Sequence, residues 1–265
     1  MTKQNGEVIF DAKHYEALNA ARTKTFERVF APLQNPLSLK TAVDVGCGVG
    51  YFTHFLSQLG LDVLGVDGRE ENILEARRRY PDLRFEVMDA QDPALSSLGQ
   101  FDLVFCYGLL YHLENPFVTV RSIAKMARKL VAVEGVVYPS AEPILVLLQE
   151  GDSRDQGLNY VAFYPSETAL VQMLSRSGFP ACYWPAAFPK HADFEISANG
   201  FRQRTFLFAF QTDIQLDSLT EWRGVPSDLS PWGMAPLYPV PTTVSKIYSF
   251  VHGKLRATSK QLGFR

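Results

Sequence analysis

The chain has 265 residues, of which 46% are hydrophobic, and its 26 Lys and Arg residues nearly balance 28 Asp and Glu residues. This length suits one α/β domain with additions, and a net charge of −2 gives no general attraction to nucleic acid or anionic membranes. No apolar run of membrane-spanning length occurs, and residues 1–7 lack the apolar core of a signal peptide. Cys47, Cys106 and Cys182 lack metal-ligand spacing, so we expect reduced thiols, no metal site and a cytoplasmic protein.

Residues 11–30 predict a helix ahead of the first strand, and we treat residues 1–36 as an N-terminal cap. One stripe at three- and four-residue steps is mostly apolar but contains Tyr15 and Arg22. A phenol and a guanidinium on an inward face suit a carboxylate ligand. The alternative is a surface helix whose Tyr and Arg merely extend toward solvent.

A glycine turn joins the first predicted strand to a helix that begins at Tyr51. The turn contains Gly46, Gly48 and Gly50, and the acidic residue Asp44 precedes it. Glycines let the backbone approach a ligand, and the helix N-terminus offers free N–H groups. The dinucleotide-binding pattern requires Gly or Ala where this chain has Tyr51, so the turn fits a cationic nucleoside better than NAD.

The next two predicted strands each end in an acidic residue. Residues 61–67 end in Asp67, and residues 83–89 end in Asp89. An acid at the position of Asp67 meets the ribose hydroxyls in nucleotide-binding βαβ units. Asp67 could instead cap the helix that follows it.

These elements resemble the class I S-adenosylmethionine-dependent methyltransferases, whose first motif places an acidic residue before G-x-G-x-G. The resemblance covers residues 40–211 and implies a doubly wound, Rossmann-like α/β sheet of seven strands, mostly parallel with the last strand antiparallel, and with helices on both faces. It implies S-adenosylmethionine as cofactor and S-adenosylhomocysteine as product. Asp89 and Ala90 are then expected to meet the adenine, and the N-terminal helix to meet the methionine carboxylate. The full set of expected cofactor-binding residues is Tyr15, Arg22, Asp44, Gly46, Gly48, Gly50, Asp67, Gly68, Asp89, Ala90 and Tyr107.

His112 is the candidate catalytic residue. Residues 101–107 predict a fourth strand, and His112 follows its end, beside the expected methyl group. Imidazole is a suitable general base near neutral pH if the acceptor is a hydroxyl. The alternative is a histidine that only supports the next helix. Tyr111 and Glu134 are weaker candidates for substrate contact.

Residues 139–165 interrupt the strand–helix pattern with a short apolar piece and the polar run 150–157, which predicts either a substrate lid or an ordinary surface loop. A helix from about 165 and two final strands complete a methyltransferase domain over residues 37–211. Residues 212–265 are rich in proline and predict an arm with a closing basic helix over 243–261. A partner or anionic substrate for this arm is a further hypothesis.

Three other methyl-transfer chemistries lack their motifs here. The turn [DN]-P-P-[YF] does not follow the fourth strand, no Pro-Cys dipeptide occurs, and no three-cysteine cluster motif is present. What remains is direct displacement at the sulfonium methyl by an O, N or C nucleophile, with a small molecule as the expected acceptor. The alternatives are a tRNA wobble-uridine modification enzyme of the same fold, which the net charge does not support, and a non-catalytic sensor or partner subunit that binds S-adenosylmethionine.

Overall fold

The computed structural model describes residues 9–198 and 200–222. These residues form an eight-stranded sheet of order β10-β8-β9-β5-β4-β1-β2-β3 and a two-stranded sheet of β6 and β7. The strands are β1 (Thr41–Val45), β2 (Asp62–Asp67), β3 (Arg84–Val87), β4 (Phe101–Tyr107), β5 (Ala127–Val136), β6 (Leu145–Gln149), β7 (Val161–Pro165), β8 (Ala181–Pro185), β9 (Arg204–Phe210) and β10 (Leu219–Glu221). The helices are α1 (Lys13–Gln34), α2 (Tyr51–Gln58), α3 (Glu70–Arg79), α4 (Pro116–Met126) and α5 (Glu167–Arg176), with short 3₁₀ turns η1 (Ile9–Asp11), η2 (Pro93–Leu98), η3 (Leu110–His112) and η4 (Ala192–Phe194).

Strands β1 to β5 run parallel, which confirms the predicted doubly wound α/β fold. The central strand β1 pairs with β2 on one side and with β4 on the other. The chain therefore reverses its direction of winding between β1 and β4. Ligands of open α/β sheets bind at such a reversal, outside the carboxyl ends of the strands.

The last strands differ from the expectation in one respect. Strand β9 pairs antiparallel with β5 and with β8, as the resemblance implies. An eighth strand, β10, then pairs antiparallel with β8, although Leu219–Glu221 belongs to the segment predicted to be a separate arm. Three residues are too few to show the alternation that marks a strand in sequence. The predicted helix over 243–261 lies outside the described residues.

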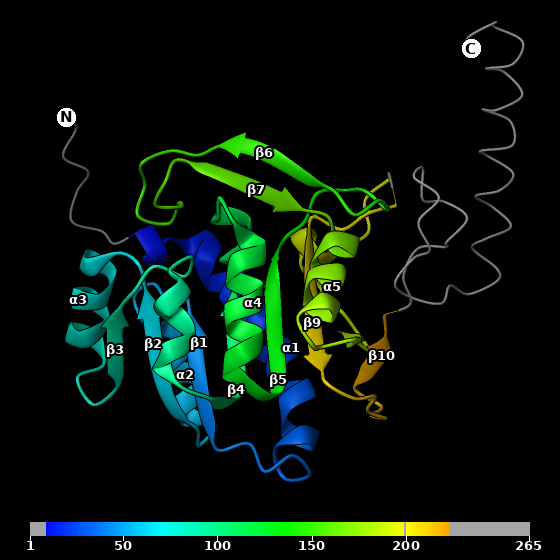
Figure 1. Ribbon diagram of the computed structural model, residues 1–265, viewed down its shortest axis with the longest axis horizontal. Helices are drawn as coiled ribbons and strands as arrows, with labels where there is room; N and C mark the ends of the chain where they lie inside the picture. The colour runs from blue at the N-terminus through cyan, green and yellow to red at the C-terminus, as the bar shows by residue number, and fades with distance from the viewer. Residues whose placement is uncertain (1–8, 199, 223–265) are drawn as a thin grey trace, which may run out of the picture. The chain divides into compact units, whose positions relative to one another are not determined.

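The main hydrophobic core lies between α1, α2 and one face of the sheet. Phe26 of α1 is fully buried at its centre, stacked on Phe30 at 5.3 Å between ring centroids and edge-on to Phe105 of β4 at 5.1 Å. The opposite face carries α4 and α5, which lie in front of the sheet while α1 lies behind it (Figure 1). The apolar stripe predicted for residues 11–30 thus packs on the domain, which anchors Tyr15 and Arg22 beside the strand ends.

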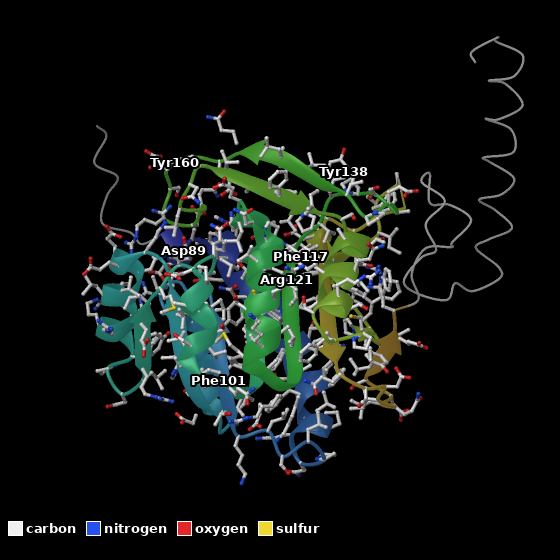
Figure 2. The ribbon with its side chains drawn as sticks, viewed as in Figure 1. Asp89, Phe101, Phe117, Arg121, Tyr138 and Tyr160 are labelled. Carbon is white, nitrogen blue, oxygen red and sulfur yellow. The ribbon has the colours of Figure 1, made fainter. Side chains whose placement is uncertain are left out.

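The insertion between β5 and α5 forms an antiparallel hairpin of β6 and β7. The hairpin lies across the end of the molecule where β4 and β5 finish (Figure 1), and the amide of Phe163 donates to the carbonyl of Leu113 at 2.9 Å. Tyr138 and Tyr160 lie at this end, opposite Phe101 at the start of β4 (Figure 2). We refer to residues 145–165 as the lid.

Among the described residues, none of the helices combines the length and the apolar character needed to cross a bilayer.

Candidate active site

The glycine turn is held in place by the neighbouring strand. Gly46, Gly48 and Gly50 have φ values of 81°, 53° and 85°, a region that residues with a side chain rarely adopt. The amide of Gly46 donates to the carbonyl of Val66 at 2.8 Å, and the amide of Gly48 donates to Asp67 Oδ2 at 2.9 Å. The backbone is therefore open toward the carboxyl ends of the strands, where a ligand can approach it closely.

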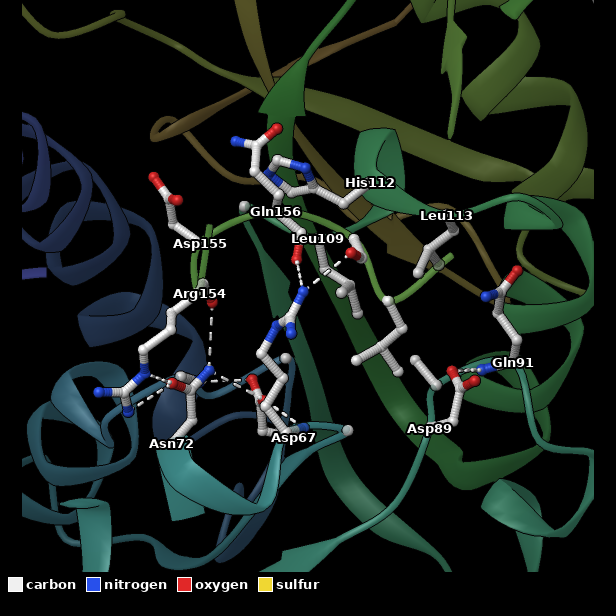
Figure 3. A pocket seen from close by; sticks show the side chains of 18 of the residues that line it. Asp67, Asn72, Asp89, Gln91, Leu109, His112, Leu113, Arg154, Asp155 and Gln156 are labelled. Atoms are coloured by element: carbon white, nitrogen blue, oxygen red, sulfur yellow. Dashed lines mark hydrogen bonds between the residues drawn. The ribbon is translucent and has the colours of Figure 1, made fainter. Parts of the chain in front are cut away.

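A first cavity, of about 640 Å³, lies at this edge (Figure 3). Its floor comes from the ends of β1, β2, β3 and β4, and its cover comes from the lid. The lining includes Gly46, Gly48, Asp67, Gly68, Met88, Asp89, Ala90, Gly108, Leu109, His112, Leu113 and the lid residues Arg154 to Leu158.

Asp67 and Asp89 stand at the ends of neighbouring strands in this cavity. Asp67 Oδ1 accepts from the amide of Arg69 at 2.9 Å and from Asn72 Nδ2 at 3.2 Å, in addition to the bond from Gly48 to its other oxygen. Burial raises the pKa of Asp67, although these hydrogen bonds oppose the shift. Asp89 Oδ1 accepts from the amide of Gln91 at 2.9 Å. Asp67 thus caps local N–H groups and also lines the cavity.

A second cavity, of about 680 Å³, continues from the first toward α1 and β4. Tyr15, Arg22, Tyr107 and Tyr111 are among its lining residues. Both cavities share Phe10, Gly46, Gly48, Gly108, His112 and Asp155. The two cavities therefore form one cleft with two lobes, and His112 and the lid residue Asp155 lie at their junction.

His112 makes a short contact with the lid. Its Nδ1 lies 2.6 Å from Oε1 of Glu150, and Oε2 of Glu150 accepts from the amide of Gly157 at 2.6 Å. The carboxylate of Glu150 is buried, with only 3% of its side chain exposed. A carboxylate can only accept, so this contact places the hydrogen on Nδ1 and leaves Nε2 as the acceptor.

Asp44 and Gly50 do not reach either cavity, contrary to the expectation. Asp44 is 1% exposed and accepts a hydrogen bond from Thr53 Oγ1 at 2.7 Å. Burial raises the pKa of Asp44 to about 7. A Cβ at Gly50 would lie 2.9 Å from the ring of Phe85, so this glycine permits packing of the turn against β3. The acidic residue before the turn therefore supports α2 from within the core.

Tyr15, Arg22 and Tyr107 line the second lobe, but two of them already have partners. Tyr15 donates to Asp155 Oδ2 at 2.7 Å, and Arg22 lies 2.8 Å from the fully buried Glu134. Glu134 thus balances the charge of Arg22, so a ligand carboxylate would have to share the Arg22 guanidinium with Glu134. The hydroxyl of Tyr107 is buried without a hydrogen-bond partner among the described residues.

Several residues that line the cleft are not predicted by the sequence patterns. Phe10 lies 3.5 Å from the position of a Cβ on Gly48, and Arg69 donates to the lid carbonyls of Gln156 and Gly157 at 3.1 and 2.9 Å. Arg154 Nη2 donates to Asn72 Oδ1 at 2.9 Å (Figure 3). The polar run 150–157 is the one available signal, and these contacts hold it over the cleft.

A Rossmann-like sheet with a glycine turn after β1, acids after β2 and β3, and a lidded cleft defines the class of nucleoside-binding α/β methyltransferase folds. A family model described as a methyltransferase domain matches residues 43–131, which span β1 to β5. Residues 43–131 thus match the methyltransferase domain, and the sheet that contains them has the fold of the class I S-adenosylmethionine-dependent methyltransferases.

Named relatives agree with this family. The ubiquinone biosynthesis O-methyltransferase of Bordetella avium is 28% identical over 120 residues, 44% of this chain and 48% of that protein. The tRNA U34 carboxymethyltransferase of Actinobacillus succinogenes is 31% identical over 153 residues, 54% of this chain and 46% of that protein. The chain thus spans about half the length of the curated relatives it matches.

A solved structure shares the fold. The N-terminal domain of EvdMO1, crystallised with S-adenosylhomocysteine bound, aligns with a TM-score of 0.60 over 75% of this chain and 84% of that chain, at 20% identity. At this identity the likeness concerns the fold alone.

Proposed function

We propose that this protein binds S-adenosylmethionine in the two-lobed cleft and transfers its methyl group to an oxygen nucleophile of a small-molecule acceptor. The observation that carries the proposal is that one cavity is lined by the glycine turn, by Asp67, by Asp89 and by His112. When bound there, S-adenosylmethionine supplies a methyl group activated by its sulfonium. The residues of the cleft would bind the cofactor, orient the acceptor beside its methyl group and accept the proton that the acceptor loses.

The first lobe fits an adenosine. Asp67 would accept from ribose hydroxyls with the lone pairs that its backbone contacts leave, and Gly68 gives the ligand room beside it. Asp89 and Ala90 would meet the polar edge of the adenine, while Met88, Leu109 and Leu113 offer apolar surface to its faces. Acids and apolar side chains from separate strands thus converge on one cavity.

The second lobe fits the amino-acid part of the cofactor and the acceptor. Gly46 and Gly48 present open backbone there, and Tyr15, Arg22 and Tyr107 supply polar side chains. His112 lies between the lobes, so its Nε2 can accept the proton of an acceptor hydroxyl placed in line with the methyl group. Glu150 would stabilise the imidazolium that forms, as the carboxylate of a His–carboxylate pair does.

An oxygen acceptor is favoured because displacement by a hydroxyl needs a base, and the His112–Glu150 pair provides one at the junction. The lid over the cleft and the near-neutral charge favour a small molecule over tRNA. The relative named as an O-methyltransferase is in keeping with this chemistry.

The test is methyl transfer from labelled S-adenosylmethionine to three pools: phenols and other hydroxyl compounds, small amines, and bulk tRNA. We expect label in the hydroxyl pool only. Label in tRNA would identify the alternative, a wobble-uridine modification enzyme. Tight binding of the cofactor without label in any pool, including a small-molecule cell extract, would identify a non-catalytic sensor.

A further inference from the structure

Asp155 is the one lid residue that lines both lobes of the cleft. It belongs to the loop between β6 and β7, whereas the other shared residues come from η1, the glycine turn and the segment after β4. The lid therefore brings a carboxylate to the junction of the lobes, beside Gly46 and Gly48. The position of this charge depends on the lid, not on the sheet.

The two oxygens of Asp155 have different surroundings. Oδ2 accepts from the hydroxyl of Tyr15 at 2.7 Å. Oδ1 is buried and has no hydrogen-bond partner among the described residues. Burial acts to raise the pKa of Asp155, but the nearby donors of Ser153, Tyr15 and the Asp155 amide, together with the charge of His112, outweigh it and hold the pKa below its ordinary value. The carboxylate is therefore ionised at neutral pH, with one oxygen unsatisfied.

The neighbouring charges are already paired within the protein. Arg22 lies 2.8 Å from Glu134, and Arg79 lies 2.7 Å from Asp11. Among the described residues, no cationic side chain lies within ion-pair distance of Asp155. An ionised carboxylate in a partly buried site is costly unless a cation with N–H donors meets it. The cleft therefore has a place for a positive charge at Oδ1 of Asp155.

We propose that Oδ1 of Asp155 accepts from the α-ammonium of the methionine part of S-adenosylmethionine, so that the lid recognises the amino-acid end of the cofactor. This inference rests on the proposed function. An ammonium carries three N–H donors and satisfies the free oxygen, whereas a sulfonium has no hydrogen to donate. Tyr15 positions the carboxylate by holding its other oxygen.

A consequence is selectivity among sulfur nucleosides. S-adenosylmethionine and S-adenosylhomocysteine both carry the α-ammonium, whereas 5′-methylthioadenosine lacks the amino-acid part. The lid contact should therefore strengthen binding of the first two nucleosides and have no effect on binding of the third. The contact does not depend on the methyl group that is transferred.

The experiment is calorimetric titration of the full chain with these three nucleosides, without any acceptor. In Asp155→Asn, affinity for S-adenosylmethionine and S-adenosylhomocysteine should fall by about 10- to 100-fold, the range for a hydrogen bond to a charged group, while affinity for 5′-methylthioadenosine stays the same. Asp152→Asn is the matched control, because Asp152 is exposed on the same loop and lines neither lobe. Tyr15→Phe keeps the charge of Asp155 and should weaken binding of the same two ligands to a smaller extent. This variant provides a second test if Asp155→Asn folds poorly.

Other outcomes overturn the proposal. Loss of affinity for S-adenosylmethionine alone would indicate that Asp155 interacts with the sulfonium. Equal loss of affinity for all three nucleosides would indicate that Asp155 only supports the packing of the lid. Unchanged binding in both variants would show that Asp155 does not contact the cofactor, and the proposed function would stand. Failure of the wild-type protein to bind any of the three nucleosides would overturn the proposed function itself.

Discussion

The imidazole of His112 and the carboxylate of Glu150 lie 2.6 Å apart, although 38 positions separate them in the chain. The contact joins η3, which follows β4, to the first residue after β6. The second oxygen of Glu150 takes the amide of Gly157, so one carboxylate holds both the imidazole and the lid loop. The orientation of His112 therefore depends on a closed lid.

Replacing the imidazole tests its role as a base. His112→Ala should lower turnover of a hydroxyl acceptor by about 10²- to 10⁴-fold, the usual range for a general base, with little change in affinity for S-adenosylmethionine. Initial rates at saturating cofactor measure the turnover, and calorimetry measures the affinity. His191→Ala is the control, since His191 lines neither lobe. Near-full activity of His112→Ala would make His112 a structural residue.

Glu150→Gln removes the charge beside His112 but keeps a side chain of the same shape. We expect turnover to fall by about 10-fold or more while cofactor affinity stays the same, because the imidazolium loses its partner. A double-mutant cycle gives the control. In the double variant with His112→Ala, the Glu150 change should cost no further activity, since both act through one proton transfer. Additive losses would show that Glu150 acts through the lid alone.

Asp67→Ala should weaken binding of S-adenosylmethionine by about 10- to 100-fold, the range for a lost hydrogen bond to a charged group. Calorimetry measures the affinity, and circular dichroism checks that the fold persists. Asp62→Ala is matched to it, because Asp62 begins the same strand and its side chain is 67% exposed, away from the cleft. If the melting temperature falls sharply while affinity stays unchanged, Asp67 serves only to hold the glycine turn.

Two glycines of the lid provide a steric test of its closure. A Cβ at Gly157 would lie against the backbone oxygen of His112, whereas a Cβ at Gly151 would meet nothing within 4 Å. Gly157→Ala should therefore displace the lid, lower turnover and speed proteolytic cleavage between β6 and β7. Gly151→Ala should leave both readouts unchanged. Equal cleavage of the two variants would show that the loop is not held by this contact.

Asp44 predicts a pH dependence of stability. Burial raises its pKa in the folded state to about 7, above the ordinary value of 3.8, so the folded protein holds a proton that the unfolded chain releases. The stability that this proton contributes is present below about pH 4 and is lost as pH rises through about 7. Asp44→Asn cannot titrate but still accepts from Thr53. The melting temperature of Asp44→Asn minus that of the wild type should increase from about pH 4 to about pH 7 and stay constant above that pH. A constant difference between the two curves would contradict the shift.

The alternation of strands and helices was predictable because each element has its own local pattern. The bounds of β4, Phe101–Tyr107, follow from a run that is apolar except for Asp102. The grouping of Asp67, Asp89 and His112 follows from the rule that parallel strands end at one edge. Glu150 and Asp155 were not predictable, because their partners His112 and Tyr15 lie 38 and 140 positions away and only the folded lid unites them. The burial of Asp44 also depends on tertiary packing, through Thr53 of α2.

Strand β10 has a consequence for how the chain can be shortened. It covers the outer edge of β8, where Thr220 pairs with Trp184, and its own outer edge is only three residues long and carries an exposed glutamate. A chain cut after residue 211 would leave the N–H and C=O groups of β8 open to pairing with another molecule, a known route to aggregation. A chain that ends just after Glu221 retains this protection, so a soluble fragment for crystallisation should keep the last short strand.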